Sequence, residues 1–185
     1  RNPDYFKKDR PYLDEIAVRT IDSRATRILA FSTGEFDITF PSDVSVPLLK
    51  DIKARSPEAI CEMTTTGTLI NLMVNRVNPP FDNPAIRKAM SLALDRKPFN
   101  SILMEGHARM GGAMLPQPEG EWGMPAEMIN SLAGYAPDAE KNLKEARSIM
   151  EGLGYSEAKP LQIKIQTRNL PTYRDAAVIL ISQLK

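Results

Sequence analysis

The chain has few of the residue types on which catalytic and metal centres depend. Its 185 residues include one cysteine, Cys61, one histidine, His107, and one tryptophan. A single cysteine excludes an internal disulfide and a cysteine-rich metal site, and the histidine has no second strong ligand at a recognisable spacing. The motifs G-x-S-x-G and H-E-x-x-H and a phosphate loop ending in Gly-Lys-Ser/Thr do not occur. We therefore expect no enzyme activity, no cofactor and no metal.

The net charge is also small, and long apolar runs are lacking. Lysine and arginine total 24 against 23 acidic residues, so the net charge of +1 provides no basic surface for nucleic acid. No stretch approaches the roughly 20 apolar residues of a membrane span, and the N-terminus lacks the apolar core of a signal peptide. The hydrophobic fraction of 42% and the charged fraction of 25% are ordinary for a globular domain. We expect a folded domain without nucleic-acid partners.

The hydrophobic pattern alternates between strand-like and helix-like periods. It predicts an α/β fold with a mixed sheet and flanking helices, because short connections and a probable hairpin around Gly67 argue against a purely parallel sheet. Residues 108–137 are rich in glycine and proline and are expected to be mostly irregular. The predicted strands are 13–21, 36–40, 59–65, 69–75 and 161–167, and the predicted helices are 23–33, 42–55, 84–94, 98–105, 125–132, 138–152 and 172–185.

The most informative stretch is residues 78–96, NPPFDNPAIRKAMSLALDR. It follows an apolar run, 69–75, that is typical of a buried strand. Asp82 or Asn83 is suited to cap a helix whose first turn holds Pro84, where the missing N–H costs nothing. Apolar residues then recur at helical spacing and form one face of that helix: Ile86, Ala89, Met90, Ala93 and Leu94.

This stretch resembles the signature of the family 5 extracellular solute-binding proteins, which deliver dipeptides, oligopeptides or nickel to ABC importers. Further fragments resemble the same family in the same order along the chain. They are NPDYF…RPYLD at 2–14, RATRILAFSTGEFDI at 24–38, GHA…LPQP at 106–118 and APDAEK…LGY at 136–155. The resemblance therefore extends over almost the whole chain.

The resemblance implies a two-lobed periplasmic-binding-protein-like fold of type II, cluster C-like. It also implies that residues 1–185 are a single domain, an incomplete second lobe, with the first lobe and the C-terminal end absent. The implied function is to bind peptides in a cleft between lobes and to deliver them to the permease subunits of an ABC importer. The implied location is periplasmic, or extracellular and membrane-associated, with the signal peptide upstream. We expect a monomer.

Three segments are candidates for lining the ligand cleft. A protein that binds peptides of varied sequence must bond their backbone and hold their charged ends. A glycine turn lets backbone approach a ligand closely, a tryptophan between glycines can stack on it, and an arginine after a strand can bind a carboxylate. Each segment can instead have a purely structural role: the first as an ordinary turn, the second by placing an aromatic residue in the core, and the third as a solvated loop. The candidate residues are Thr66, Gly67, Thr68, Trp122, Gly123, Arg168, Asn169 and Tyr173.

Other functions remain open at this stage. Related proteins carry nickel complexes, haem, opines or oligosaccharides, although the lack of histidine and cysteine clusters disfavours direct metal ligation. An alternative of a different class is an interaction module built on the same fold. Such a module docks a receptor or chaperone and binds no solute. An enzyme that uses Glu35 and Asp37 as an acid–base pair is the weakest reading. A continuous first lobe in the parent gene would favour transport over the interaction module.

Overall fold

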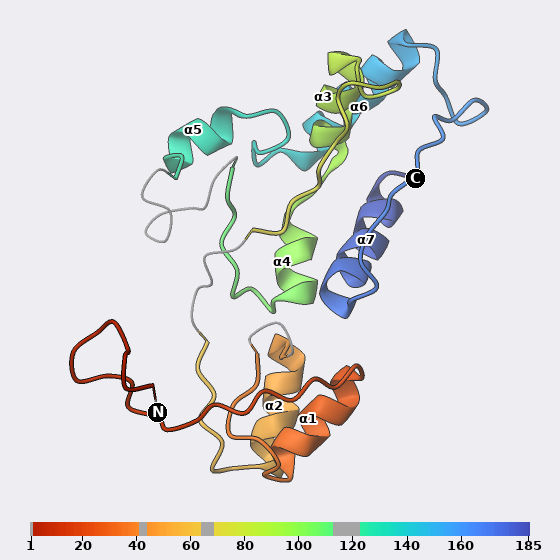
Figure 1. Cartoon of the computed structure of the whole chain (residues 1–185). Helices are drawn as coiled ribbons and strands as arrows, with labels where there is room; N and C mark the ends of the chain where they lie inside the picture. Colours follow the sequence, from red (N-terminus) through yellow and green to blue (C-terminus); the bar gives the residue numbers. More distant parts are fainter. Residues whose placement is uncertain (1, 41–43, 64–68, 113–122) are drawn as a thin grey trace. The chain divides into compact units, whose positions relative to one another are not determined.

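The computed structural model of the chain describes residues 2–40, 44–63, 69–112 and 123–185. The elements in these ranges are all helices (Figure 1). Their bounds are α1 Arg24–Ser32, α2 Val46–Arg55, α3 Pro84–Ala93, α4 Lys97–Leu103, α5 Ala126–Ser131, α6 Ala139–Gly152 and α7 Pro171–Gln183. None of the described helices is both long and apolar enough to cross a membrane.

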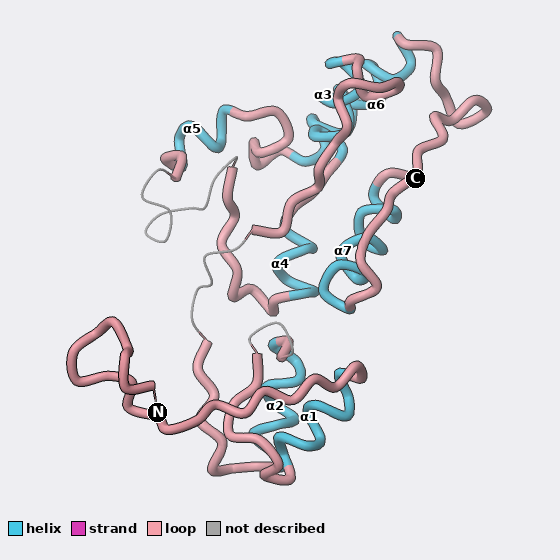
Figure 2. The backbone as a smooth tube through the Cα atoms, viewed as in Figure 1, coloured by secondary structure: helices cyan, strands magenta, loops and turns pink. Residues whose placement is uncertain are grey.

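The mixed α/β sheet predicted from the sequence is wrong, because the described residues contain no β-strand. Figure 2 draws the described parts of all five predicted strands as loop, and the β pairing that remains is an isolated bridge between Ser156 and Lys159. A period of two predicts which side each residue faces. A strand exists only when a neighbouring backbone completes its hydrogen bonds. In the described ranges, these segments do not pair with one another.

Segment 161–167 keeps the alternation of a strand although it lacks a strand's hydrogen bonds. Leu161, Ile163 and Ile165 are half-buried, and the residues between them, Gln162, Lys164 and Gln166, are exposed. The sequence pattern therefore sets the side-chain directions even where no partner strand is present.

The predicted helices are confirmed within the described residues, although the start predicted at residue 42 lies outside them, and the cap predicted for α3 acts as expected. The Asn83 side chain accepts a hydrogen bond from the N–H of Ala85, next to Pro84 in the first turn of α3. The side chains of Ser23 and Asp138 cap α1 and α6 in the same way. These caps satisfy backbone N–H groups that have no partner within the helix.

The chain divides into two compact units, Arg1–Val44 with Asp51–Ala59, and Ser45–Lys50 with Ile60–Lys185. In the first unit, Ala30 of α1 and Ile52 of α2 are buried, with 5% and 2% of their surface exposed. The hydroxyl of Ser56, after α2, donates to the carbonyl of Ser32 at 3.1 Å. This hydrogen bond joins the residue after α2 to the end of α1.

The second unit is organised around the packing of α3 on α6. Ala89 and Leu92 of α3 form a buried cluster with Ala146 of α6, against which Ile149 and Met150 pack. Small residues at this contact let the two helices approach closely. The ammonium of Lys88 lies 2.7 Å from a carboxylate oxygen of Glu145 at the edge of the same contact. The apolar face predicted for α3 therefore packs as expected, with Leu92 as an additional member.

Arg96, just after α3, forms hydrogen bonds both to the end of that helix and to the loop before α6. Its guanidinium donates to the carbonyls of Gly134 at 2.8 Å, Leu94 at 3.2 Å and Ser91 at 3.4 Å, and to the Ser91 hydroxyl at 3.1 Å. Its central carbon lies 3.8 Å from the centre of the Tyr135 ring. One side chain thus satisfies carbonyls at the end of α3 and also contacts an aromatic ring.

Replacing Arg96 by lysine is expected to destabilise the second unit by about 1–2 kcal/mol. An ammonium keeps the charge but cannot reach the same acceptors at once or stack as a plane on Tyr135. Arg147→Lys is the matched control, since Arg147 is exposed on α6. Urea unfolding measures both variants. Equal stability of the two variants would show that the contacts of Arg96 contribute nothing.

The end of α7 is joined to the turn between α3 and α4 by a pair of reciprocal hydrogen bonds. The Asp95 N–H donates to the side-chain oxygen of Gln183 at 3.1 Å, and the Gln183 side-chain nitrogen donates to the Asp95 carbonyl at 2.9 Å. The Gln183 side-chain amide accepts one hydrogen bond and donates another, as a backbone peptide group does. It fixes α7 against residues 88 positions earlier in the chain.

Candidate functional site

A cleft of about 370 Å³ lies in the second unit, between two segments that are distant in the sequence. One wall is residues 72–75, and the other is residues 163–166. The remaining lining residues come from the turn before α3, from α3 and from the C-terminal end of the chain: Phe81, Met90 and Leu184. Both walls are segments that the sequence predicted as strands.

The lining of the cleft combines apolar and polar surface in similar amounts. Leu72, Met73 and Val74 provide apolar surface on one wall, and Asn75 is a polar group on the same wall. Lys164 and Gln166 are the polar residues of the opposite wall. Such a lining offers both apolar contacts and hydrogen-bonding groups to a ligand.

Arg168 and Asn169 lie in a tight turn that leads from the second wall into α7. The N–H of Leu170 donates to the carbonyl of Arg168 at 2.8 Å. Both side chains are exposed. Arg168 makes no ion pair with any residue in the described ranges, so its guanidinium is available to an external anion.

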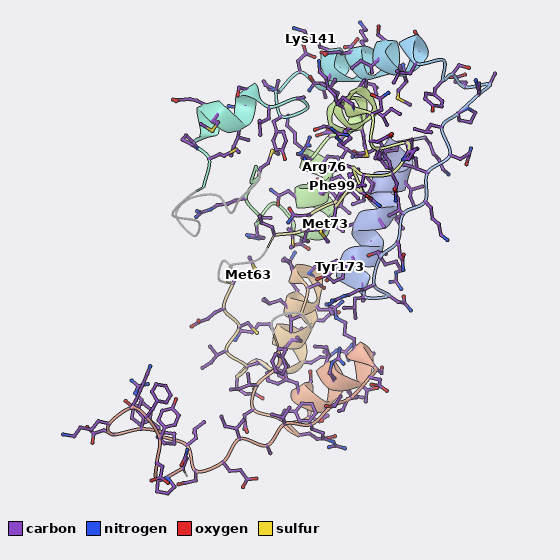
Figure 3. All side chains as sticks on the ribbon, turned by 45° about the horizontal axis from the view of Figure 1, so that its top comes forward. Met63, Met73, Arg76, Phe99, Lys141 and Tyr173 are labelled. Atoms are coloured by element: carbon purple, nitrogen blue, oxygen red, sulfur yellow. The ribbon has the colours of Figure 1, made fainter. Side chains whose placement is uncertain are left out.

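The start of α7 adds a second positive feature beside this turn. Leu170 holds the N-cap position without a side-chain hydrogen bond, and Pro171 occupies the first turn. The N–H groups of Tyr173 and Arg174 both donate to the Leu170 carbonyl. The first turn of α7 thus lacks an acidic residue or a polar cap, and the partial positive charge of the helix end is not neutralised there. Tyr173 is 39% exposed on this turn, and it is labelled in Figure 3 together with Met73 of the cleft wall.

The other candidate residues are not brought to this place by the described structure. Gly123 is buried, just before α5. Thr66, Gly67, Thr68 and Trp122 lie outside the described residues, so their expected contact with a ligand stays a prediction. His107 is exposed, Cys61 is half-buried, and the described residues contain no cluster of metal-ligating side chains.

The comparison with known proteins identifies the family. The family described as "Bacterial extracellular solute-binding proteins, family 5 Middle" matches residues 1–185, the whole chain. The chain belongs to this family. The resemblance of residues 78–96 and of the fragments on either side is thereby confirmed.

Curated relatives of this family 5 domain include named binding proteins. It is 26% identical over its whole length to the periplasmic oligopeptide-binding protein OppA of Haemophilus influenzae, and 23% identical to OppA of Escherichia coli K12, in each case over 33% of the relative. It is also 26% identical, over 82% of its length and 27% of the relative, to the glutathione-binding protein GsiB of Shigella flexneri. The chain spans about a third of the length of the curated relatives it matches. No solved structure matches it.

Within the family 5 domain, residues 78–96 build the scaffold beside the cleft. Phe81 and Met90 from this stretch line the cleft, while Ile86, Ala89 and Leu92 are buried. Sequence reasoning did not identify the two facing walls as a cleft. The signal that was available is that 69–75 is mostly apolar, that 161–167 alternates apolar and polar residues, and that both segments are free of proline and glycine.

Proposed function

We propose that this domain is part of one lobe of a solute-binding protein that serves an ABC importer outside the cytoplasm. Its solute is a peptide or a peptide-like molecule, which the protein passes to membrane permease subunits. The observation that carries this proposal is the family match over all 185 residues, together with relatives named for oligopeptide and glutathione binding.

The chemistry around the start of α7 supports a peptide-like solute. Peptides and glutathione both carry free carboxylates at neutral pH. Arg168 can donate two parallel hydrogen bonds to a carboxylate, and the positive end of α7 follows it in the chain. Asn169 and Tyr173 add neutral hydrogen-bonding groups in the same turn. We propose that these three residues contact the solute and that Arg168 holds a carboxylate.

Arg168→Ala is expected to weaken peptide binding about tenfold and to leave the melting temperature nearly unchanged. The lost interaction is a charge-assisted hydrogen bond, while the exposed arginine contributes little to stability. The measurement is calorimetry of the protein as the cell produces it, against di- to hexapeptides and glutathione. Arg174→Ala is the matched control, because Arg174 is an exposed arginine on α7, the helix that follows Arg168, and pairs with Asp175 at 3.3 Å.

The possible outcomes separate the proposals. Peptide binding that Arg168→Ala does not change would remove Arg168 from the site and keep the function. A response only to nickel–histidine, haem, an opine or an oligosaccharide would contradict the peptide assignment. Binding of no solute, together with capture by a receptor or chaperone, would favour the interaction module.

A further inference from the structure

Gln183 forms a hydrogen-bonded junction at the C-terminal end of α7. Its side-chain oxygen accepts from the Asp95 N–H at 3.1 Å, and its side-chain nitrogen donates to the Asp95 carbonyl at 2.9 Å. The Asp95 carboxylate in turn accepts a hydrogen bond at 3.0 Å from the N–H of Lys97, the first residue of α4. Asp95 therefore joins the end of α7 to the turn from which α4 begins.

This junction adds directional bonds to the packing of α7. The helix lies against α4, and it buries Ala176 and Leu180, which leave 9% and 6% of their surface exposed. Apolar burial is non-directional, so it sets the distance between two helices more strictly than their position along each other. Hydrogen bonds weaken steeply when donor and acceptor are misaligned. The pair of bonds at Gln183 therefore fixes where α7 lies along its own axis.

The opposite end of the same helix carries the groups proposed to contact the solute. Tyr173 lies in the first turn of α7, and Arg168 lies in the turn that is closed by the N–H of Leu170 just before it. The helix has 13 residues and is therefore about 20 Å long. Because its backbone hydrogen bonds make it a rigid element, a displacement at Gln183 also moves its first turn and the turn that holds Arg168.

We propose that Gln183 is a positioning residue for solute binding. It acts through α7 and not by contact with the solute: its bonds to Asp95 hold the helix at the position in which Arg168 meets the solute carboxylate. This inference rests on the proposed function, in which Arg168 holds that carboxylate. It deepens the proposed function by making the affinity for the solute depend on a side chain at the far end of the helix.

A double-mutant cycle tests the proposal in the protein as the cell produces it, with di- to hexapeptides and glutathione as the probes. Gln183→Met keeps the length of the side chain and removes both hydrogen bonds to Asp95. Calorimetry should show binding weakened about fivefold by Gln183→Met alone, but less than about twofold in an Arg168→Ala background. The second effect is small because the group through which Gln183 acts is then absent. Gln162→Met is the matched control, since Gln162 is exposed, and it should leave the affinity unchanged.

A second variant, Gln183→Glu, guards against a general loss of structure in Gln183→Met. The glutamate keeps an oxygen that accepts from the Asp95 N–H, but it cannot donate to the Asp95 carbonyl and sets a negative charge against it. It should weaken binding at least as much as Gln183→Met, again only when Arg168 is present, while circular dichroism shows the helices intact.

The outcomes separate this inference from the proposed function. An unchanged affinity in both Gln183 variants, or the same loss with and without Arg168, would overturn the positioning role and leave the proposed function standing. An Arg168→Ala variant that binds like the original protein would remove Arg168 from the site and overturn the positioning role with it. Binding of no peptide and no glutathione by the original protein would contradict the proposed function itself.

Discussion

Gly134→Ala is expected to destabilise the second unit by about 4 kcal/mol. Gly134 has φ +82°, a conformation that costs an alanine about 1–2 kcal/mol. A Cβ at this position would also lie 1.9 Å from the carbonyl oxygen of Ser91. That oxygen belongs to the backbone of α3, so it cannot move without disturbing the helix that packs on α6. Urea unfolding followed by circular dichroism measures the loss.

Gly154→Ala separates the cost of the backbone conformation from the cost of the steric clash. Gly154 has nearly the same backbone conformation, φ +84°, but a Cβ there would meet no atom within 4 Å. The loss of stability should therefore be limited to the cost of the backbone conformation, about 1–2 kcal/mol. If the two substitutions cost the same, the close approach of the Gly134 loop to α3 does not exist in solution.

Ile86→Asp is expected to unfold the second unit or to cost about 4 kcal/mol or more. Ile86 is 5% exposed on α3, and the buried residues of the described part of the chain include no cation that could pair with a carboxylate at that position. A buried charge without a partner must either be desolvated or take up a proton, and both are unfavourable. The helix signal in circular dichroism and the cooperativity of urea unfolding report the effect.

Ile102→Asp provides the control for this second substitution. Ile102 is 62% exposed on α4, so the same chemical change should shift the free energy of unfolding by only about 0.5 kcal/mol. A folded and cooperative Ile86→Asp variant would show that the packed face of α3 has been assigned incorrectly.

These two predictions concern the same part of the molecule. The stretch 78–96 that identifies the family is mainly a scaffold: Ala89 and Leu92 pack on α6, and Arg96 donates a hydrogen bond to the loop that contains Gly134. The groups proposed to contact solute lie elsewhere, in the turn before α7. The stretch that identifies the family therefore packs beside the cleft, whereas the residues proposed to contact the solute lie outside this stretch.

The sequence by itself determined the helices and the family. Helical periodicity and capping are local, so Asn83 with Pro84 was sufficient to locate the start of α3. The order of motifs along the chain was sufficient to identify the family, since it requires no knowledge of contacts. The alternation in 161–167 likewise determined which side chains are half-buried.

Only the tertiary structure decided whether the strand-like segments form a sheet and which of them face each other. Segments that line the same cleft, such as 72–75 and 163–166, lie far apart in sequence, and periodicity contains no information about which segment faces which. The approach of Gly134 to Ser91 and the bonds between Asp95 and Gln183 are equally long-range. Hydrogen bonds and packing between distant segments depend on where the whole chain brings them, which local preferences do not specify.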